Sequence, residues 1–368
     1  MLSREPAFYR DFRCLGGACP LTCCRDWDIV VDKESLADYA TAPEGLRQTI
    51  AAALITDEEG DVCFRLASDG RCALLDEDGL CPIQRRWGEE HLCEHCASYP
   101  RFIEEYGCLT EACQVVSCPE AARLVLDEGI FRLVETDDGS PDAPFEGVDG
   151  ALLAGLTASR STAFALLTDA DRPLWGRLAG LLDYADALQK HIDFGDVRTM
   201  EVVSPPPLTR SGTGNGLQPM AVRLLDLLAR LDPLRPEWPA LLHARAGELA
   251  ALSPEQYQAL TGRFHAAQPQ WDVHLERLAC YLVFRHWPKA VNDDGLYPRA
   301  ALTAAACLAL HHLALLAWND APSFSDGDEA LLWARFSREV EHDEANFFAL
   351  AEALADLEQW PLAQIFQQ

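Results

Sequence analysis

The residues of this chain best suited to chemistry are its cysteines, and they are concentrated in the N-terminal third. Twelve of the fourteen cysteines lie between Cys14 and Cys118. The other two, Cys280 and Cys307, fall in apolar helical patterns and are expected to be small core residues. Because thiolates are natural ligands of zinc and of iron–sulfur clusters, this density of cysteine predicts a metal-binding module.

The spacing of the cysteines indicates how they could hold a metal. The glycines and the proline of residues 12–24, FRCLGGACPLTCC, predict an irregular loop that can wrap around a metal. An Asp-Gly hairpin signal between Cys72 and Cys81 predicts that the chain reverses there and returns Cys81 toward Cys72. Cys93 and Cys96 form a Cys-x-x-Cys pair, which can bind one metal from a single turn.

Cys118 stands at a predicted helix start, because Pro119 suits the first position of a helix. A thiolate at that place would be stabilised by the positive end of the helix. Neither the usual radical S-adenosylmethionine spacing of cysteines nor either ferredoxin spacing occurs in the chain. A structural zinc module therefore remains the alternative to an iron–sulfur centre.

The elements that must position these thiols are predicted to be mainly α-helical. We expect a cysteine-rich metal-binding N-terminal module with a small hairpin at residues 1–134, followed by a multi-helical body. An acidic stretch rich in Gly and Pro at 135–150 is typical of a linker. The helical domain would then span 151–368, with a loop at about 202–216.

Several segments carry specific helical signals. Residues 33–54 are typical of two helices joined by a turn, and apolar residues within 174–188 form one face of a helix. Ser253 begins a capping box with proline at the first helical position. The longest apolar stretch, 301–318, is interrupted by polar residues and is short for a membrane span, so it predicts a buried helix and no transmembrane segment.

Composition limits the class of partner. The chain has 368 residues, of which 49% are apolar, so it can bury a sizeable core. Its net charge of -28 argues against nucleic acid and anionic lipid and would attract a cationic partner, although such charge can also serve solubility alone. No apolar run of the signal-peptide kind opens the chain, so we expect a cytoplasmic protein, in a compartment where disulfides are rare.

Two C-terminal stretches place polar groups in apolar surroundings. The first, at 284–300, and the second, at 336–350, are therefore candidates for catalysis. Their candidate residues are Asp293, Asp294, Tyr297, Glu341 and His342. If the second stretch is helical, His342 and Asn346 share one face. The alternatives are an Asp-Gly turn in the first stretch and a solvated helix face in the second.

Together these segments resemble the flagellin lysine N-methylase (FliB) family. The similarity is carried by FRCLGGACPLTCCRDWDI, CALLDEDGLCPIQRRWGEEHLCEHCASYPRF, SCPEAARLVL, FRHWPKAVNDDGLYPRA and FSREVEHDEANF. The middle of the chain, about 135–270, matches only in being helical. A related set of cysteines also occurs in small zinc- or iron-chelating proteins, so a non-enzymatic metal-binding protein is the alternative.

The resemblance implies a 4Fe-4S cluster, S-adenosylmethionine as the methyl donor and a lysine of a flagellin-like protein as the acceptor. The same chemistry on another peptide remains open. The family's cysteines correspond here to Cys14, Cys19, Cys23, Cys24, Cys72, Cys81, Cys96 and Cys118. These eight could supply two four-ligand centres, or one cluster and a structural site. This chain adds Cys63, Cys93, Cys108 and Cys113 to the family pattern.

Methyl transfer to lysine also gives the candidate polar residues a role. The amine must be neutral to attack a methyl sulfonium, whereas free lysine has a pKa near ~10.4. An apolar pocket or a base could remove the proton, and Asp293, Asp294, Glu341 and His342 are the candidate bases. Tyr297 could face the sulfonium through a cation–π contact.

Overall fold

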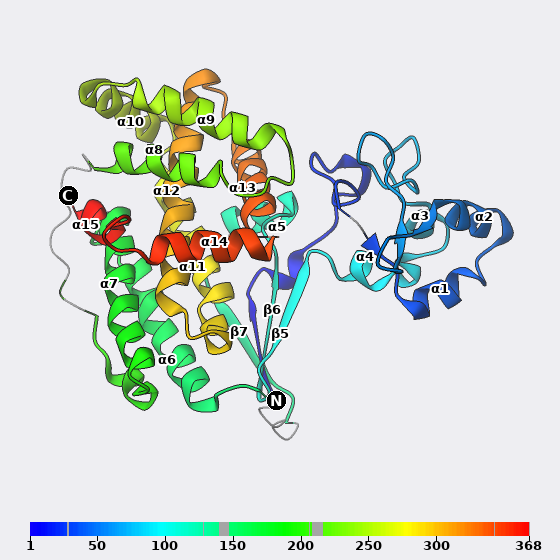
Figure 1. Cartoon of the computed structure of the whole chain (residues 1–368), viewed down its shortest axis with the longest axis horizontal. Helices are drawn as coiled ribbons and strands as arrows, with labels where there is room; N and C mark the ends of the chain where they lie inside the picture. Colours follow the sequence, from blue (N-terminus) through cyan, green and yellow to red (C-terminus); the bar gives the residue numbers. More distant parts are fainter. Residues whose placement is uncertain are drawn as a thin grey trace.

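The chain folds into a helical body and a small cysteine-rich lobe that projects from one side of it (Figure 1). The computed structural model describes residues 1–27, 29–127, 129–139, 147–205, 207, 216–341 and 343–367. Each part has its own buried apolar cluster. The cluster of the lobe runs from Ile29 to Cys96 in the chain, whereas the cluster of the body joins residues as distant as Phe8 and Phe366.

The lobe consists of short helices around a small sheet. Its elements are β2 (Ile29–Val30), α1 (Lys33–Tyr39), α2 (Glu44–Ala53), β3 (Leu54–Thr56), β4 (Val62–Phe64), α3 (Pro82–Arg86), η3 (Glu89–His91) and α4 (Glu94–Ser98). The strands pair antiparallel in the order β2–β4–β3. Asp32 caps α1 by accepting the backbone N–H of Ser35 at 2.8 Å, so the predicted pair of helices over 33–54 is confirmed.

The small hairpin of the lobe lies elsewhere than the sequence suggested. The chain does reverse between Cys72 and Cys81, where Asp76 and Leu80 are joined by a backbone hydrogen bond of 3.0 Å. Residues 72–81, all of them described, form turns rather than strands. The strand hairpin is β3–β4, whose turn at Asp57 is closed by that side chain accepting two backbone N–H groups.

A four-stranded sheet forms the side of the body that faces the lobe (Figure 1). Its strands are β1 (Leu2–Pro6), β5 (Arg101–Glu105), β6 (Leu109–Gln114) and β7 (Leu133–Asp137), in the order β5–β6–β1–β7. Only the β1–β6 pair is parallel among these strands. The start of the chain therefore belongs to the body's sheet, and the chain leaves the body to form the lobe and then returns.

Helices make up the rest of the body, so the predicted mainly α fold is confirmed. They are α5 (Pro119–Asp127), α6 (Gly150–Leu167), α7 (Leu174–Asp193), α8 (Leu217–Leu228), α9 (Glu237–Ala250), α10 (Pro254–Ala267), α11 (Trp271–His286), α12 (Leu296–Asp320), α13 (Asp326–Val340), α14 (Glu344–Ala355) and α15 (Leu362–Gln367). Four 3-10 helices complete the described elements outside the lobe: η1 (Tyr9–Asp11), η2 (Gly16–Ala18), η4 (Val197–Val202) and η5 (Pro288–Asn292).

The long helix α12 runs through the middle of the body, packed against α7, α11 and α14. The described chain has two helices long and apolar enough to cross a membrane, α6 and α12. In the most apolar stretch of α12, 94% of the residues are buried inside the protein, which identifies α12 as the predicted core helix. The predicted capping box of Ser253 is also present, at the start of α10.

The expected linker is partly replaced by structure. Residues 135–137 belong to β7, because their backbone completes the edge of the sheet beside β1. Residues 140–146 of the linker, and 206 and 208–215 of the loop expected at 202–216, lie outside the described residues. The division of the chain at residues 134 and 151 stays a prediction about domains.

Candidate metal centre and active site

The eight cysteines of the family pattern meet where the lobe joins the body. All eight line one or both of two adjoining cavities, of about 810 Å³ and about 70 Å³. The additional cysteines line neither of these cavities; they are Cys63, Cys93, Cys108 and Cys113. Residues distant in sequence, from Cys14 to Cys118, are thus brought around one shared space, as the metal prediction requires.

Backbone N–H groups point at several of these sulfurs. The Sγ atoms of Cys19 and Cys72 accept from Leu21 and Leu74, and Cys81 accepts from the backbone at the start of α3. Cys118 accepts from the first turn of α5, where its predicted helix start is confirmed. Such donors stabilise a thiolate, and hydrogen bonds to sulfur are typical of cysteine-bound metal centres.

Burial nevertheless opposes charge on these thiols. It raises the pKa of Cys72 and of Cys118 to about 11, so without a cation both sulfurs would be neutral near pH 7. A bound metal would reverse that balance, because coordination deprotonates a thiol. Sulfur donors, backbone N–H groups and a shared cavity together make the site fit a thiolate-bound metal centre.

The described thiols are paired rather than gathered into a compact group of four. Cys23 and Cys24 are hydrogen-bonded to each other through their side chains. The His, Cys, Asp or Glu group of the described chain with three ligand atoms within 4.8 Å of one another is His274, Asp326 and Glu329.

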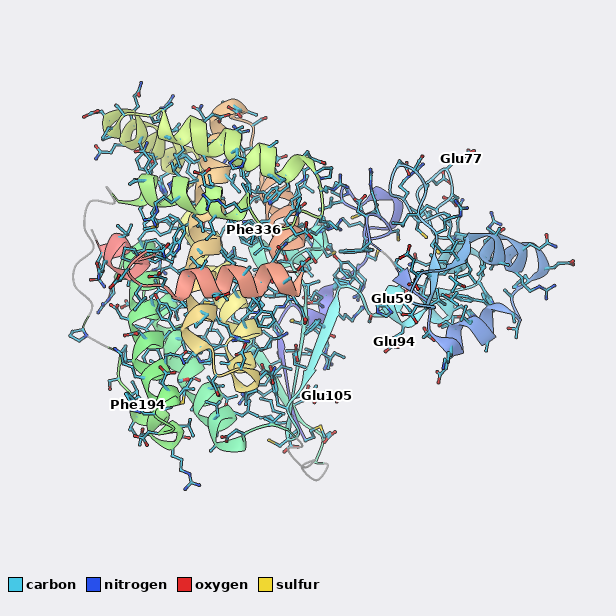
Figure 2. All side chains as sticks on the ribbon, in the orientation of Figure 1. Glu59, Glu77, Glu94, Glu105, Phe194 and Phe336 are labelled. Carbon is cyan, nitrogen blue, oxygen red and sulfur yellow. The ribbon has the colours of Figure 1, made fainter. Side chains whose placement is uncertain are left out.

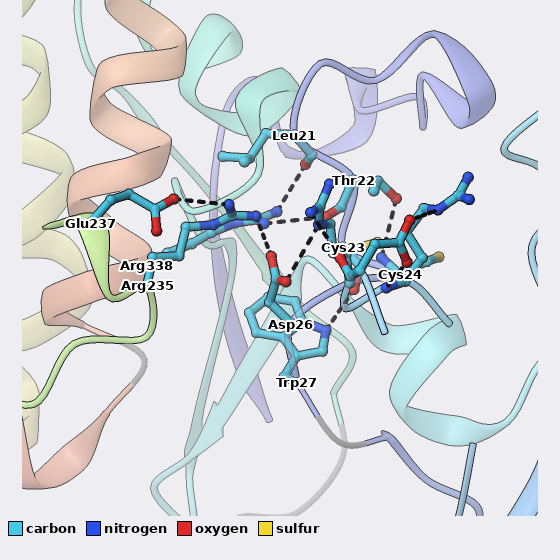
Figure 3. A network of polar contacts seen from close by, with 12 residues as sticks. Leu21, Thr22, Cys23, Cys24, Asp26, Trp27, Arg235, Glu237 and Arg338 are labelled. Atoms are coloured by element: carbon cyan, nitrogen blue, oxygen red, sulfur yellow. Dashed lines mark hydrogen bonds and ion pairs between the residues drawn. The ribbon is translucent and has the colours of Figure 1, made fainter. Parts of the chain in front are cut away.

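A buried arginine of the body holds the cysteine loop in place. Arg338, on α13, donates to the backbone oxygens of Leu21 at 2.9 Å and Thr22 at 3.2 Å, and to that of Ser117 at 3.1 Å (Figure 3). These carbonyls precede Cys23 and Cys118 in the chain. One planar guanidinium therefore fixes the loop carrying the paired cysteines relative to the helix that carries Cys118.

A second contact from the body supports the same loop. Arg235, between α8 and α9, forms an ion pair with Asp26 (Figure 3). Trp27 donates its indole N–H to the backbone oxygen of Cys23 at 2.5 Å, and the guanidinium of Arg338 lies 5.1 Å from the Trp27 ring. Sequence reasoning missed both arginines; the one available signal was that Arg338 lies in the FSREVEHDEANF segment.

The first candidate catalytic stretch is held by salt bridges and hydrogen bonds. Asp293 binds Arg299 through both oxygens, at 2.7 and 2.9 Å, and accepts from the backbone N–H of Gly295 at 3.0 Å. Asp294 adopts a left-handed backbone conformation with φ of 60°. Tyr297 is buried on α12, and burial raises its pKa. The Asp-Gly turn considered as the alternative is therefore present.

The second candidate stretch is not one continuous helix. Glu341 caps the C-terminal end of α13 and Asp343 caps the start of α14, so two helices stand where one was considered. The face expected to be shared by His342 and Asn346 stays a prediction. His342 lies outside the described residues. Asn346 is buried and bonds to the backbone of Asp232, where it joins α14 to the loop after α8.

The Glu341 side chain is buried between the cationic guanidinium of Arg285 and the imidazole of His286. Its carboxylate lies 2.7 Å from Arg285 Nη1 and 3.3 Å from His286 Nε2. Although burial opposes the charge, Arg285 and then the His286 hydrogen bond lower the pKa of Glu341 to about 2. Burial lowers the pKa of His286 to about 4, so its imidazole is neutral near pH 7. His286 Nδ1 is buried without a hydrogen-bond partner in the described chain.

The two candidate stretches meet through one aromatic ring. Phe347 lies 5.3 Å from the His286 ring, centroid to centroid, and the Arg299 guanidinium lies 5.9 Å from the Phe347 ring. The Asp293–Arg299 pair and the Glu341–His286 pair are thus neighbours in the body. None of the four described candidates, Asp293, Asp294, Tyr297 and Glu341, lines either cysteine cavity, whereas Arg338 lines the smaller one.

Comparison with known proteins agrees with this arrangement. The family model described as FliB lysine N-methylase C-terminal domain matches residues 160–367. The chain is 32% identical over 130 residues to the flagellar biosynthetic protein FliU of Salmonella muenchen, which covers 34% of this chain and 76% of that protein.

Two proteins named lysine-N-methylase, from Salmonella choleraesuis and Salmonella typhimurium, are also 32% identical over 130 residues. That match covers 34% of this chain but only 32% of each of them, so the chain aligns with about a third of their length. No solved structure matches. Because the family model spans more than half of its residues, the chain belongs to the FliB lysine N-methylase family, a family of methyltransferases.

Proposed function

We propose that this protein transfers a methyl group from S-adenosylmethionine to lysine side chains of a flagellin-like protein, using a 4Fe-4S cluster held by its N-terminal cysteines. The observation that carries the proposal is the meeting of all eight family cysteines around adjoining cavities. Membership of a lysine N-methylase family supports the reaction class.

In the reaction one bond breaks, one bond forms and one proton is released. The sulfonium carbon–sulfur bond breaks as a carbon–nitrogen bond forms, which yields S-adenosylhomocysteine, methyl-lysine and a proton. A thiolate-bound cluster would supply an iron able to bind the polar groups of the donor. The cysteines hold that group, and Arg338 keeps their loop in place.

Removal of the lysine proton is assigned to the polar groups of the C-terminal stretches. Glu341 stays ionised because Arg285 faces it, which makes it a weak base but a strong electrostatic partner for a lysine ammonium. The neutral imidazole of His286 beside it can accept a hydrogen bond through Nδ1. We propose Glu341, His342, Asp293 and Asp294 as the bases to be tested, and Tyr297 as the group facing the sulfonium.

The charge of the chain suits a lysine-bearing substrate. The net charge is -28, and exposed carboxylates such as Glu59, Glu77 and Glu94 project from the lobe, whereas apolar side chains such as Phe336 fill the body (Figure 2). An acidic surface raises the local concentration of a cationic partner and speeds its association. A cytoplasmic location, where flagellin is present before export, belongs to the same proposal.

The direct test combines the purified protein with a labelled donor and flagellin. Protein prepared without oxygen should be brown, contain iron and sulfide, and transfer label to flagellin lysines identified by mass spectrometry. Glu341→Gln and His342→Ala should abolish turnover and leave the cluster absorbance near about 400 nm unchanged. A colourless protein that holds zinc and transfers no label would support a metal-binding protein and refute the methylase.

A further inference from the structure

The eight cavity-lining cysteines separate into two groups according to what each packs against. Four of them pack in the apolar cluster of the lobe and line the larger cavity: Cys24, Cys72, Cys81 and Cys96. Of the other four, all of which line the smaller cavity, Cys118 belongs to the apolar cluster of the body, and Cys14, Cys19 and Cys23 belong to neither cluster. We call these the lobe set and the interface set.

Backbone contacts connect the members within each set. In the lobe set, the N–H of Cys72 donates to the backbone oxygen of Cys24 at 2.9 Å, while Cys81 and Cys96 lie at the starts of α3 and α4. In the interface set, Gly16 N donates to Cys14 Sγ at 3.4 Å, and Cys19 N donates to the oxygen of Gly16 at 3.0 Å. The sets meet at the adjacent residues Cys23 and Cys24, whose side chains are hydrogen-bonded to each other, and each cavity is lined by members of both sets.

The two sets also differ in what holds them. The lobe set is built wholly from the lobe. The interface set joins the loop to the first turn of α5 in the body, and Arg338 spans that junction by binding Leu21, Thr22 and Ser117.

We propose that the cysteines hold two separate four-thiolate metal centres, one in the lobe set and one in the interface set, rather than one centre shared among eight ligands. The proposal rests on the proposed metal binding and goes beyond it, because it assigns each ligand and adds a second centre. The interface centre links the lobe to the body beside Arg338, and the lobe centre adds metal–thiolate bonds to the lobe's own apolar cluster.

The sets can be separated by thiol protection. Anaerobically purified protein would be alkylated under native conditions, and each cysteine scored by mass spectrometry in the wild type, in Cys19→Ser and in Cys72→Ser. Metal-bound thiolates are protected from alkylation. In Cys19→Ser, we expect Cys14, Cys23 and Cys118 to become reactive while the lobe set stays protected and about half of the centres are lost.

Cys63→Ser is the matched control, because Cys63 is a buried thiol of the lobe that lines neither cavity and whose contact with Asp57 a hydroxyl can replace. It should keep both sets protected. Iron, sulfide and zinc analysis of Cys19→Ser would then show whether the remaining lobe centre is a cluster or zinc; either supports two centres. Exposure of all seven remaining thiols in Cys19→Ser would show one shared centre and overturn the proposal.

Folding of the lobe does not limit the test. If Cys72→Ser unfolds the lobe, the Cys19→Ser result alone decides, since the lobe set must stay protected there. The outcome is also independent of methyl transfer. Two protected sets in a protein without methylase activity would refute the proposed function alone, whereas one shared centre in an active methylase would refute this inference alone.

Discussion

Replacement of Arg338 by alanine should loosen the metal-binding loop without unfolding the body. Arg338 is 4% exposed and donates three hydrogen bonds to carbonyl oxygens on both sides of the lobe–body junction. A hydrogen bond to a charged group contributes about 1.5–3 kcal/mol, but three do not add fully, because the variant no longer buries a guanidinium. We expect a net loss of about 1–3 kcal/mol, the range for leaving a buried polar group without its hydrogen-bond partner.

That energy sets the rate at which metal escapes. If only about 1.4 kcal/mol of it holds the loop beside Cys118, an open loop becomes about tenfold more populated in Arg338→Ala. The assay is the anaerobic transfer of iron to an excess of a coloured chelator, followed by absorbance. Arg338→Lys should fall between the wild type and Arg338→Ala, because a single ammonium cannot reproduce the fork of the guanidinium.

Arg335 provides the matched control, since it is the same residue type on the same helix, one turn away, but exposed. Arg335→Ala should release iron at the wild-type rate. Equal release rates for Arg338→Ala and Arg335→Ala would refute the role of Arg338 as an anchor. Circular dichroism of both variants should show an intact helical body.

Three further outcomes follow from charge and burial. Burial depresses the pKa of His286 to about 4, so the unfolded chain binds a proton first as pH falls from about 6.5 toward 4. Over that range the free energy of unfolding of the wild type should fall by about 3 kcal/mol relative to that of His286→Gln. Urea titrations in which the two proteins lost stability in parallel as pH fell would contradict this. Arg160→Ala should lower the free energy of unfolding by about 3–5 kcal/mol, because buried Glu111 then keeps only Arg4, at 3.9 Å, as a cationic partner. The double variant Arg160→Met with Glu111→Leu leaves no unpaired charge and should lower it less in the same urea titrations. The KM for a lysine-rich protein should rise between low and about 0.15 M salt, because ions screen the attraction to a chain of net charge -28, and a salt-independent KM would exclude electrostatic recruitment.

Local patterns in the sequence predicted local structure well. The helices over 33–54, the capping box at Ser253 and the helix start after Cys118 depend on neighbouring residues, and each is present. The apolar stretch 301–318 is likewise a buried helix, as its short length and its interruption by Thr303, His311 and His312 predicted. Where partners lie far apart in the chain, such patterns failed: residues 135–137 pair with β1, more than a hundred residues earlier, and form a strand.

The same distinction applies to the candidate site. Residue type identified the twelve clustered cysteines as candidate metal ligands, since few other functions explain so many thiols in so short a segment, and the resemblance to the family selected eight of them. Spacing could not show how they pack, because Cys24 packs against the apolar cluster of the lobe whereas the adjacent Cys23 belongs to neither cluster. Nor could it show that Glu341 is paired with Arg285 and His286, which lie on another helix.

By itself, the sequence determined the chemistry available to this protein: thiol ligands, an acidic surface and enough apolar residues for a helical body. Only the tertiary structure decided which groups meet. Arg338 reaches the carbonyls of Leu21 and Thr22 across more than three hundred residues of chain, because α13 packs against α5 beside the cysteine loop. Contacts of that kind depend on how helices pack, and no local pattern of residues specifies them.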